Sequence, residues 1–172
     1  MQFFNDVLNE DDAMYVFDKT YNGDTWKFSG YSNRHNTNGY RFWYMNLEED
    51  TFFTKKFLSR IEQLTGKNFE IDRVYANGQT YGLPGDIHRD VDENIYAPEL
   101  YYTLLYYTNP IWDVRWGGST TVINEDNTVD TIMYNHNTAV LFPSVLKHFS
   151  CEPSRHCKDL RVTVAFKLKE IV

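Results

Sequence analysis

The feature that most constrains the fold is a series of short β-forming runs after Gly66. Residues 69–75 alternate apolar and polar side chains, and residues 100–108 (LYYTLLYYT) are densely aromatic and apolar. Further runs follow, separated by turn residues such as the hairpin sequence NEDN, at residues 119–123, 128–134, 138–142, around 148 and at 160–169. Several short strands with turn signals between them predict a β-sandwich or barrel.

Two segments near the start of the sequence have the spacing of amphipathic helices. In residues 9–21, Asn9 is a suitable N-cap, and apolar residues then recur at helical spacing (Met14, Phe17 and Tyr21). In residues 48–66, an apolar stripe precedes Gly66, a residue that favours a helix end; its members are Phe53, Phe57, Ile61 and Leu64. Because each helix has one apolar face, we expect both to pack as a supporting layer on the sheet.

The length of 172 residues predicts one domain that covers residues 1–172. Within it, we expect residues 1–66 to supply the helical layer and an aromatic-rich loop, and residues 67–172 to form the β core. The aromatic-rich segment, residues 22–46, combines turn-forming Gly, Asn and Ser with seven aromatic residues. It is expected to hold one or two short strands, whose positions the pattern does not give.

Composition argues against several classes of protein. The charge balance is 17 − 24 = −7, which argues against a nucleic-acid partner. The sequence has no run of the roughly 20 apolar residues that a membrane span needs, and its N-terminal residues do not have the pattern of a signal peptide. Two cysteines, Cys151 and Cys157, are too few for a disulfide framework. We therefore expect a cytoplasmic protein without a membrane partner.

Candidate metal ligands lie in GDIHRDVDE, where His88 and Asp90 form a His-x-Asp pair. In an extended segment, residues two apart point to the same side, so this imidazole and carboxylate can converge. His148 follows the strand-like run TAVLFPS sixty residues later. Two histidines and one carboxylate on different strands of a barrel are the donor set of the facial triad that binds Fe(II).

A candidate anion-binding pair opens the last strand, where Arg161 and Thr163 lie two residues apart. Both side chains therefore fall on one face of that strand. A guanidinium fork with a neighbouring hydroxyl can bind a carboxylate through charge-assisted hydrogen bonds. Because its neighbours are apolar, Arg161 would be out of place as an ordinary arginine on the sheet surface.

In this order, the residues resemble the Fe(II)- and 2-oxoglutarate-dependent dioxygenases, particularly the prolyl 4-hydroxylase-like branch. The resemblance covers residues 69–169 and includes TLLYYTNPIWDVRWGGSTTV. It implies a double-stranded β-helix (jelly-roll) core and assigns the catalytic and metal-binding positions to His88, Asp90 and His148. It also implies contacts with 2-oxoglutarate from Arg161, Thr163, Tyr107 and Tyr75, although the spacing from Tyr75 to His88 is longer than in the family.

The resemblance implies Fe(II), 2-oxoglutarate and O2 as cofactor and cosubstrates, with ascorbate left open. The implied reaction hydroxylates a C–H bond, in particular at proline in a peptide or protein, and converts 2-oxoglutarate to succinate and CO2. Residues 22–46 and 91–99 are candidate walls of a peptide groove. Tyr102, Tyr106, Phe142 and Phe166 are candidate walls that keep the site dry, or else ordinary core residues.

Alternatives remain at several positions. Lys158 competes with Arg161 for the distal carboxylate of 2-oxoglutarate, and His156 competes with His148 as the distal metal ligand. Cys151, His156 and Cys157 resemble an incomplete zinc site, but are better interpreted as exposed loop residues. At the level of function, the alternatives are the same chemistry on a free amino acid or other small metabolite, a cupin-like metal-binding protein, and a metal-free β-sandwich.

Overall fold

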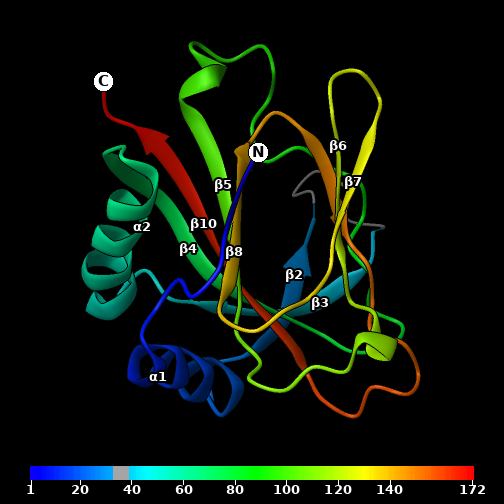
Figure 1. The fold of residues 1–172 in the computed structure, drawn as a ribbon. Coiled ribbons are helices and arrows are strands. Elements are labelled where there is room, and N and C mark those ends of the chain that lie inside the picture. Colours follow the sequence, from blue (N-terminus) through cyan, green and yellow to red (C-terminus); the bar gives the residue numbers. More distant parts are fainter. Residues whose placement is uncertain (33–38) are drawn as a thin grey trace.

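The computed structural model describes residues 1–32 and 39–172, which form two facing antiparallel sheets with helices on one side (Figure 1). Within these ranges, the large sheet has seven strands, in the order β1 (Gln2–Phe4), β8 (Thr138–Pro143), β5 (Tyr101–Tyr107), β10 (Arg161–Glu170), β4 (Phe69–Gln79), β3 (Arg41–Asn46) and β2 (Lys27–Tyr31). The small sheet of the same described residues has three, in the order β7 (Val129–Ile132), β6 (Thr120–Ile123) and β9 (Lys147–Ser150). The predicted mainly β fold with a helical layer is confirmed.

The helical layer consists of α1 (Glu10–Tyr21) and of a π-helical turn, η1 (Phe52–Phe57), that continues into α2 (Leu58–Thr65). The side chain of Asn9 caps α1 by accepting a hydrogen bond from the backbone N–H of Asp12, and Gly66 ends α2 in the left-handed conformation. Short 3-10 turns lie at η2 (Pro98–Leu100) and η3 (Val114–Trp116). Among the described residues, every helix is too short or too polar to span a bilayer.

The apolar stripe predicted for the second helix is confirmed at Phe53, Phe57 and Ile61, which are fully buried. In the stripe predicted for the first helix, Tyr21 packs against the core, but Met14 is exposed and that part of the prediction is wrong. The buried residues of α1 are Ala13, Val16 and Thr20, whereas Met14 is exposed and Phe17 and Tyr21 are half-buried.

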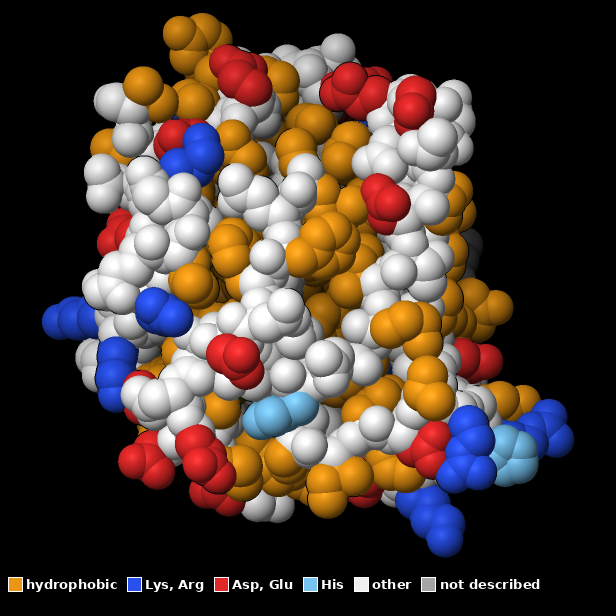
Figure 2. Space-filling model, viewed as in Figure 1, with side chains coloured by type: hydrophobic (Ala, Val, Ile, Leu, Met, Phe, Trp, Pro, Cys, Tyr) orange, Lys and Arg blue, Asp and Glu red, His pale blue; other side chains and the backbone are white. Residues whose placement is uncertain are grey.

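Successive side chains along the strands of the large sheet alternate between two environments. On β10, the outward side chains of Val162, Val164 and Phe166 pack with the helices, and Phe57 of η1 contacts the ring of Phe166 at 4.9 Å between centroids. The alternate residues face the small sheet, where Leu105, Val122 and other apolar side chains form a second cluster. On the face drawn in Figure 2, hydrophobic side chains gather between the two sheets. The polar inward residues of β10 therefore lie inside the barrel.

The predicted strands after residue 66 are all present, with ends shifted by a few residues. Residues 22–46, whose strands the sequence did not locate, contain β2 and β3, and these extend the large sheet beyond β4. The role of residues 22–46 as a groove wall falls partly on residues 33–38, which lie outside the described residues. Strand β1, which pairs with β8, was not predicted.

Candidate metal and cosubstrate site

The His-x-Asp segment runs alongside β9 and continues the small sheet. The backbones of His88 and His148 exchange hydrogen bonds of 3.1 and 2.9 Å, and Gly85 N–H donates to Ser150 at 2.9 Å. Farther along, Asp90 N–H donates to Ser144 at 3.0 Å. This pairing fixes an extended backbone, so His88 and Asp90 both point into the barrel, as their two-residue spacing predicts.

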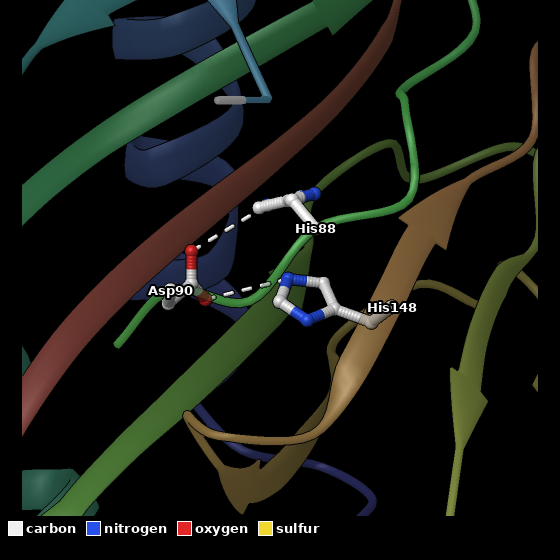
Figure 3. Close-up of side chains that lie close together, drawn as sticks. All are labelled: His88, Asp90 and His148. Atoms are coloured by element: carbon white, nitrogen blue, oxygen red, sulfur yellow. Dashed lines mark ion pairs between the residues drawn. The ribbon is translucent and has the colours of Figure 1, made fainter. Parts of the chain in front are cut away.

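The structure brings His88, Asp90 and His148 together, with ligand atoms that all lie within 4.8 Å of one another. Figure 3 shows both imidazoles turned toward the carboxylate, one from each neighbouring segment. Nε2 of His88 lies 3.5 Å from Oδ1 of Asp90, and Nε2 of His148 lies 3.3 Å from Oδ2. Among the described residues, this is the one group of three His, Cys, Asp or Glu side chains close enough to share a metal ion.

Backbone carbonyls orient both imidazoles. Nδ1 of His88 lies 2.9 Å from the carbonyl oxygen of Asp86, and Nδ1 of His148 lies 3.0 Å from that of Leu146. When Nδ1 carries the proton and donates it to the carbonyl, Nε2 presents its lone pair to the centre of the site. Burial lowers the pKa of His148, against the opposing effect of Asp90, and so favours the neutral imidazole that a metal requires.

Asp90 is held by two further side chains. The hydroxyl of Thr103 donates to Oδ2 at 2.6 Å, and the ammonium of Lys167 forms an ion pair with the same oxygen. Burial alone raises the pKa of Asp90, but the charge of Lys167, together with the contacts of the carboxylate with the two imidazoles, outweighs burial and holds this pKa well below its usual range. Asp90 is therefore an ionised carboxylate inside the barrel.

Arg161 is fully buried at the start of β10, at the other end of the inner face. Its guanidinium donates to Gly118 O at 2.6 Å, Gln79 Oε1 at 2.7 Å and Thr120 Oγ1 at 3.2 Å. Gly118 has φ +73°, and a Cβ there would lie 3.0 Å from Cδ of Arg161. The Gly-Gly step thus lets the backbone approach the arginine closely.

Of the other residues expected to contact 2-oxoglutarate, Thr163 and Tyr75 line the cavity that Arg161 also lines, whereas Tyr107 is fully buried and does not line it. Thr163 is buried opposite Tyr107 of β5 and Asn77 of β4. The Tyr107 hydroxyl donates to Thr120 Oγ1 at 3.0 Å, and burial raises the pKa of Tyr107. Tyr75 is opposite Ala165, and its ring centroid lies 5.8 Å from the Lys167 ammonium. Tyr75 is thus nearer to the metal ligands along the strands than to Arg161.

A cavity of about 1060 Å³ connects the two groups, because its lining includes the three metal-ligand candidates as well as Arg161 and Thr163. Asn77 also lines it, and among the described residues its Oδ1 is a buried oxygen without a hydrogen-bond partner. A buried amide oxygen without a partner in this cavity fits a polar ligand at this position.

Among the alternatives, the structure places Lys158 and His156 on the exposed surface of the loop before β10, away from the buried Arg161 and His148. Cys151 and Cys157 are free and half-buried, so the interpretation as exposed loop residues is wrong for the two cysteines and holds for His156. Of the two interpretations that the sequence left open for the aromatic residues, the structure favours ordinary core for Tyr102, Tyr106 and Phe166, which belong to or pack against the helix-facing core. Phe142 does face inward, 4.9 Å from the His148 ring centroid.

Sequence reasoning missed four residues that hold the site: Lys167, Thr103, Gln79 and Thr120. A signal for Lys167 was present, since it shares the inward alternation of Arg161 and Thr163 in an otherwise apolar strand. The others are contacts between distant strands, for which one sequence holds no comparable pattern.

Comparison with solved structures identifies the fold. The chain is similar to a prolyl hydroxylase from Trichoplax adhaerens, solved with a hypoxia inducible factor peptide, with TM-score 0.73 and 18% identity over 98% of this chain and 83% of that one. For a Pseudomonas putida prolyl-4-hydroxylase, the TM-score is 0.69 with 13% identity over 99% of this chain and 92% of that one. For the non-haem α-ketoglutarate-dependent epimerase SnoN of nogalamycin biosynthesis, the TM-score is 0.67 with 12% identity over 96% of this chain and 76% of that one. No protein-family model and no curated protein matches the sequence.

These similarities extend over nearly the whole chain and concern its fold. The architecture is the double-stranded β-helix shared by prolyl hydroxylases and other 2-oxoglutarate oxygenases, which confirms the predicted fold class. The chain is thus prolyl 4-hydroxylase-like in fold and carries a His-Asp-His triad. Because an epimerase shares this fold, the reaction must be argued from the site.

Proposed function

We propose that this protein is an Fe(II)- and 2-oxoglutarate-dependent dioxygenase that hydroxylates prolyl residues in a peptide or protein. The observation that carries the proposal is the convergence of His88, Asp90 and His148 in the same cavity as the buried, inward-facing Arg161. A metal-binding protein without 2-oxoglutarate has no need of that arginine. A metal-free β-sandwich has no need of either group.

The donor set fits Fe(II). Two imidazoles with inward Nε2 atoms and one ionised carboxylate are the facial-triad ligands, and the triad leaves positions for other ligands. His88, Asp90 and His148 would hold the metal ion. Solved complexes of proteins with this fold contain 2-oxoglutarate, and in SnoN also Fe³⁺. When bound, Fe(II) and 2-oxoglutarate would supply the electrons that activate O2 for the oxidation of a C–H bond.

The chain's own residues would bind and shield the cosubstrate. Arg161 would pair with the distal carboxylate of 2-oxoglutarate, and the hydroxyl of Thr163 would donate to the same group. The Tyr107 hydroxyl would join them by exchanging its hydrogen bond to Thr120 Oγ1 for one to the carboxylate. Tyr75 would line the cosubstrate nearer the metal. Leu105 and Phe142 face the interior from β5 and β8 and would exclude water from the reacting atoms.

The volume of the cavity and the segments that line it support a peptide substrate. About 1060 Å³ exceeds what a five-carbon diacid needs, and the lining reaches β2, β3 and residues 92–94. These belong to the segments 22–46 and 91–99 that the sequence suggested as groove walls. The peptide bound to the Trichoplax prolyl hydroxylase supports this substrate class, whereas the likeness to SnoN supports a small metabolite as the second candidate.

The test is 2-oxoglutarate turnover by protein purified without O2, then supplied with Fe(II), ascorbate and O2, with and without a proline-rich peptide. We expect peptide-stimulated formation of succinate and a peptide that gains one oxygen atom. His88→Ala should abolish both, because it removes a metal ligand. His156→Ala is the matched control, since this exposed histidine should leave both products unchanged.

Two results would change the assignment. Succinate formation without peptide stimulation would retain the oxygenase and favour a small-metabolite substrate. A protein that neither binds Fe(II) in a one-to-one ratio nor consumes 2-oxoglutarate would contradict the proposed function altogether.

A further inference from the structure

Lys167 carries a positive charge in the interior of the barrel. It lies on the inner face of β10, it is 5% exposed, and it lines the cavity beside the metal-ligand candidates. A lysine is rarely buried to this extent without a partner, because its ammonium loses its hydration. Its position therefore calls for a compensating anion inside the barrel.

That anion is Asp90, one of the three metal-ligand candidates. The ammonium of Lys167 forms an ion pair with Oδ2 of Asp90 and lies 3.5 Å from Oγ1 of Thr103, which donates to the same oxygen. Oδ1 of Asp90 faces Nε2 of His88 at 3.5 Å. Lys167 and Thr103 thus anchor Oδ2 from strands of the large sheet, and Nε2 of His148 lies 3.3 Å from the same oxygen.

We propose that Lys167 is a positioning residue that serves as the resident counter-ion of Asp90. It keeps the buried carboxylate compensated and in place before a metal ion arrives. Its own positive charge then lowers the affinity for that metal, because it stays close to the bound cation. This inference rests on the proposed function, since it takes the His-Asp-His group to be a metal site.

Two electrostatic consequences follow from this arrangement. Removing one partner of a buried ion pair leaves the other charge uncompensated, so the metal-free protein depends on Lys167 for stability. The metal-bound protein depends on it less, because a divalent cation compensates Asp90 instead. Loss of the ammonium should therefore weaken the metal-free fold and strengthen metal binding at the same time. A side chain that only filled space would change stability without tightening the metal site.

The experiment measures binding of Co²⁺, without 2-oxoglutarate or O2, together with thermal unfolding of the metal-free and Co²⁺-loaded protein. For Lys167→Met, we expect the Co²⁺ dissociation constant to fall by about tenfold or more, because a nearby positive charge is removed. The metal-free Tm should fall, and the rise in Tm caused by Co²⁺ should be larger than in the unmodified protein. Lys167→Arg keeps the charge, so its Co²⁺ dissociation constant and its metal-free Tm should stay closer to those of the unmodified protein.

Lys169→Met is the matched control, because Lys169 lies on the same strand but is exposed, with its ammonium over the ring of Tyr101. It should change neither the Co²⁺ affinity nor the metal-free Tm. If Lys167→Met does not fold without metal, Lys167→Gln replaces it, since it keeps a hydrogen-bond donor without the charge.

The outcomes separate the inference from the proposed function. If Lys167→Met, or its Gln replacement, binds Co²⁺ with unchanged or weaker affinity, the counter-ion role is wrong even though the metal site stands. If the unmodified protein does not bind Co²⁺, the proposed function fails first, and the inference fails with it.

Discussion

Arg161 and Lys167 are both cations on the inner face of β10, but their partners differ. The guanidinium of Arg161 donates to neutral oxygens, those of Gly118, Gln79 and Thr120. The ammonium of Lys167 pairs with a carboxylate, that of Asp90. One strand therefore carries a buried cation at each end of the site, one with neutral partners and one with an anionic partner.

This difference explains how a single strand can serve two purposes. A buried charge is costly unless an opposite charge compensates it. Lys167 already has such a partner, so its charge is part of the protein's own structure. The neutral acceptors of Arg161 orient its fork without cancelling its charge, which remains available to an anionic ligand. The partners of each residue, rather than its position on the strand, decide which cation is suited to a carboxylate of 2-oxoglutarate.

The largest effect is expected from Arg161→Met, which removes the cation that has only neutral acceptors. The KM for 2-oxoglutarate should rise by about 100-fold or more, since two charge-assisted hydrogen bonds are worth roughly 3 kcal/mol or more together. Co²⁺ binding without 2-oxoglutarate should change little, because Arg161 lies at the opposite end of the inner face from Lys167. Steady-state succinate formation and Co²⁺ titration measure the two quantities.

Lys158→Met is the control for Arg161, because this exposed lysine is the competing candidate for the same carboxylate. We expect it to leave the KM for 2-oxoglutarate unchanged. If Lys158→Met raises this KM and Arg161→Met does not, Lys158 binds the carboxylate. The contrast between Arg161 and Lys167 then does not explain how the cosubstrate is bound.

A smaller effect is expected from Gln79→Glu, which gives Arg161 a carboxylate partner and makes it resemble Lys167. The amide of Gln79 is oriented by donating to Leu83 O and Ser150 Oγ at 2.8 Å each, so its oxygen faces Arg161. A carboxylate at this position would compete with 2-oxoglutarate, and the KM should rise by about tenfold. Calorimetric titration of the variant with 2-oxoglutarate gives the dissociation constant as an independent measure.

Gln79→Met separates charge from hydrogen bonding, because it removes the acceptor without adding an anion. Its KM should rise less than that of Gln79→Glu. Equal values for the two variants would mean that Arg161 needs Gln79 for orientation alone.

The sequence predicted those parts of the site that depend on local geometry. The two-residue spacing in His88-x-Asp90 and Arg161-x-Thr163 places each pair on one side of an extended segment, and the structure has both pairs inside the barrel. The run before His148 predicted a strand, which is β8. These inferences succeed because alternation along a strand is a property of the chain itself.

The parts that the sequence left open or missed depend on which side of a strand faces which layer. Phe166 was a candidate for the site wall or for the ordinary core, and it packs on Phe57 in the helical layer because its alternation is opposite to that of Arg161. The pairing of Lys167 with Asp90 joins segments 77 residues apart. Neither the packing partner of an apolar residue nor a contact between distant strands is encoded in the local pattern of one sequence.

The smallest effect is expected from Thr163→Val, which removes a hydroxyl at nearly constant volume on the same face as Arg161. Loss of one hydrogen bond to a carboxylate that Arg161 still holds should raise the KM for 2-oxoglutarate about fivefold, or about 1 kcal/mol. Thr163→Ser should stay near the original value, because it keeps the hydroxyl. If Thr163→Val and Thr163→Ser raise the KM for 2-oxoglutarate equally, Thr163 acts through packing beside Tyr107. Binding of the distal carboxylate would then depend on Arg161.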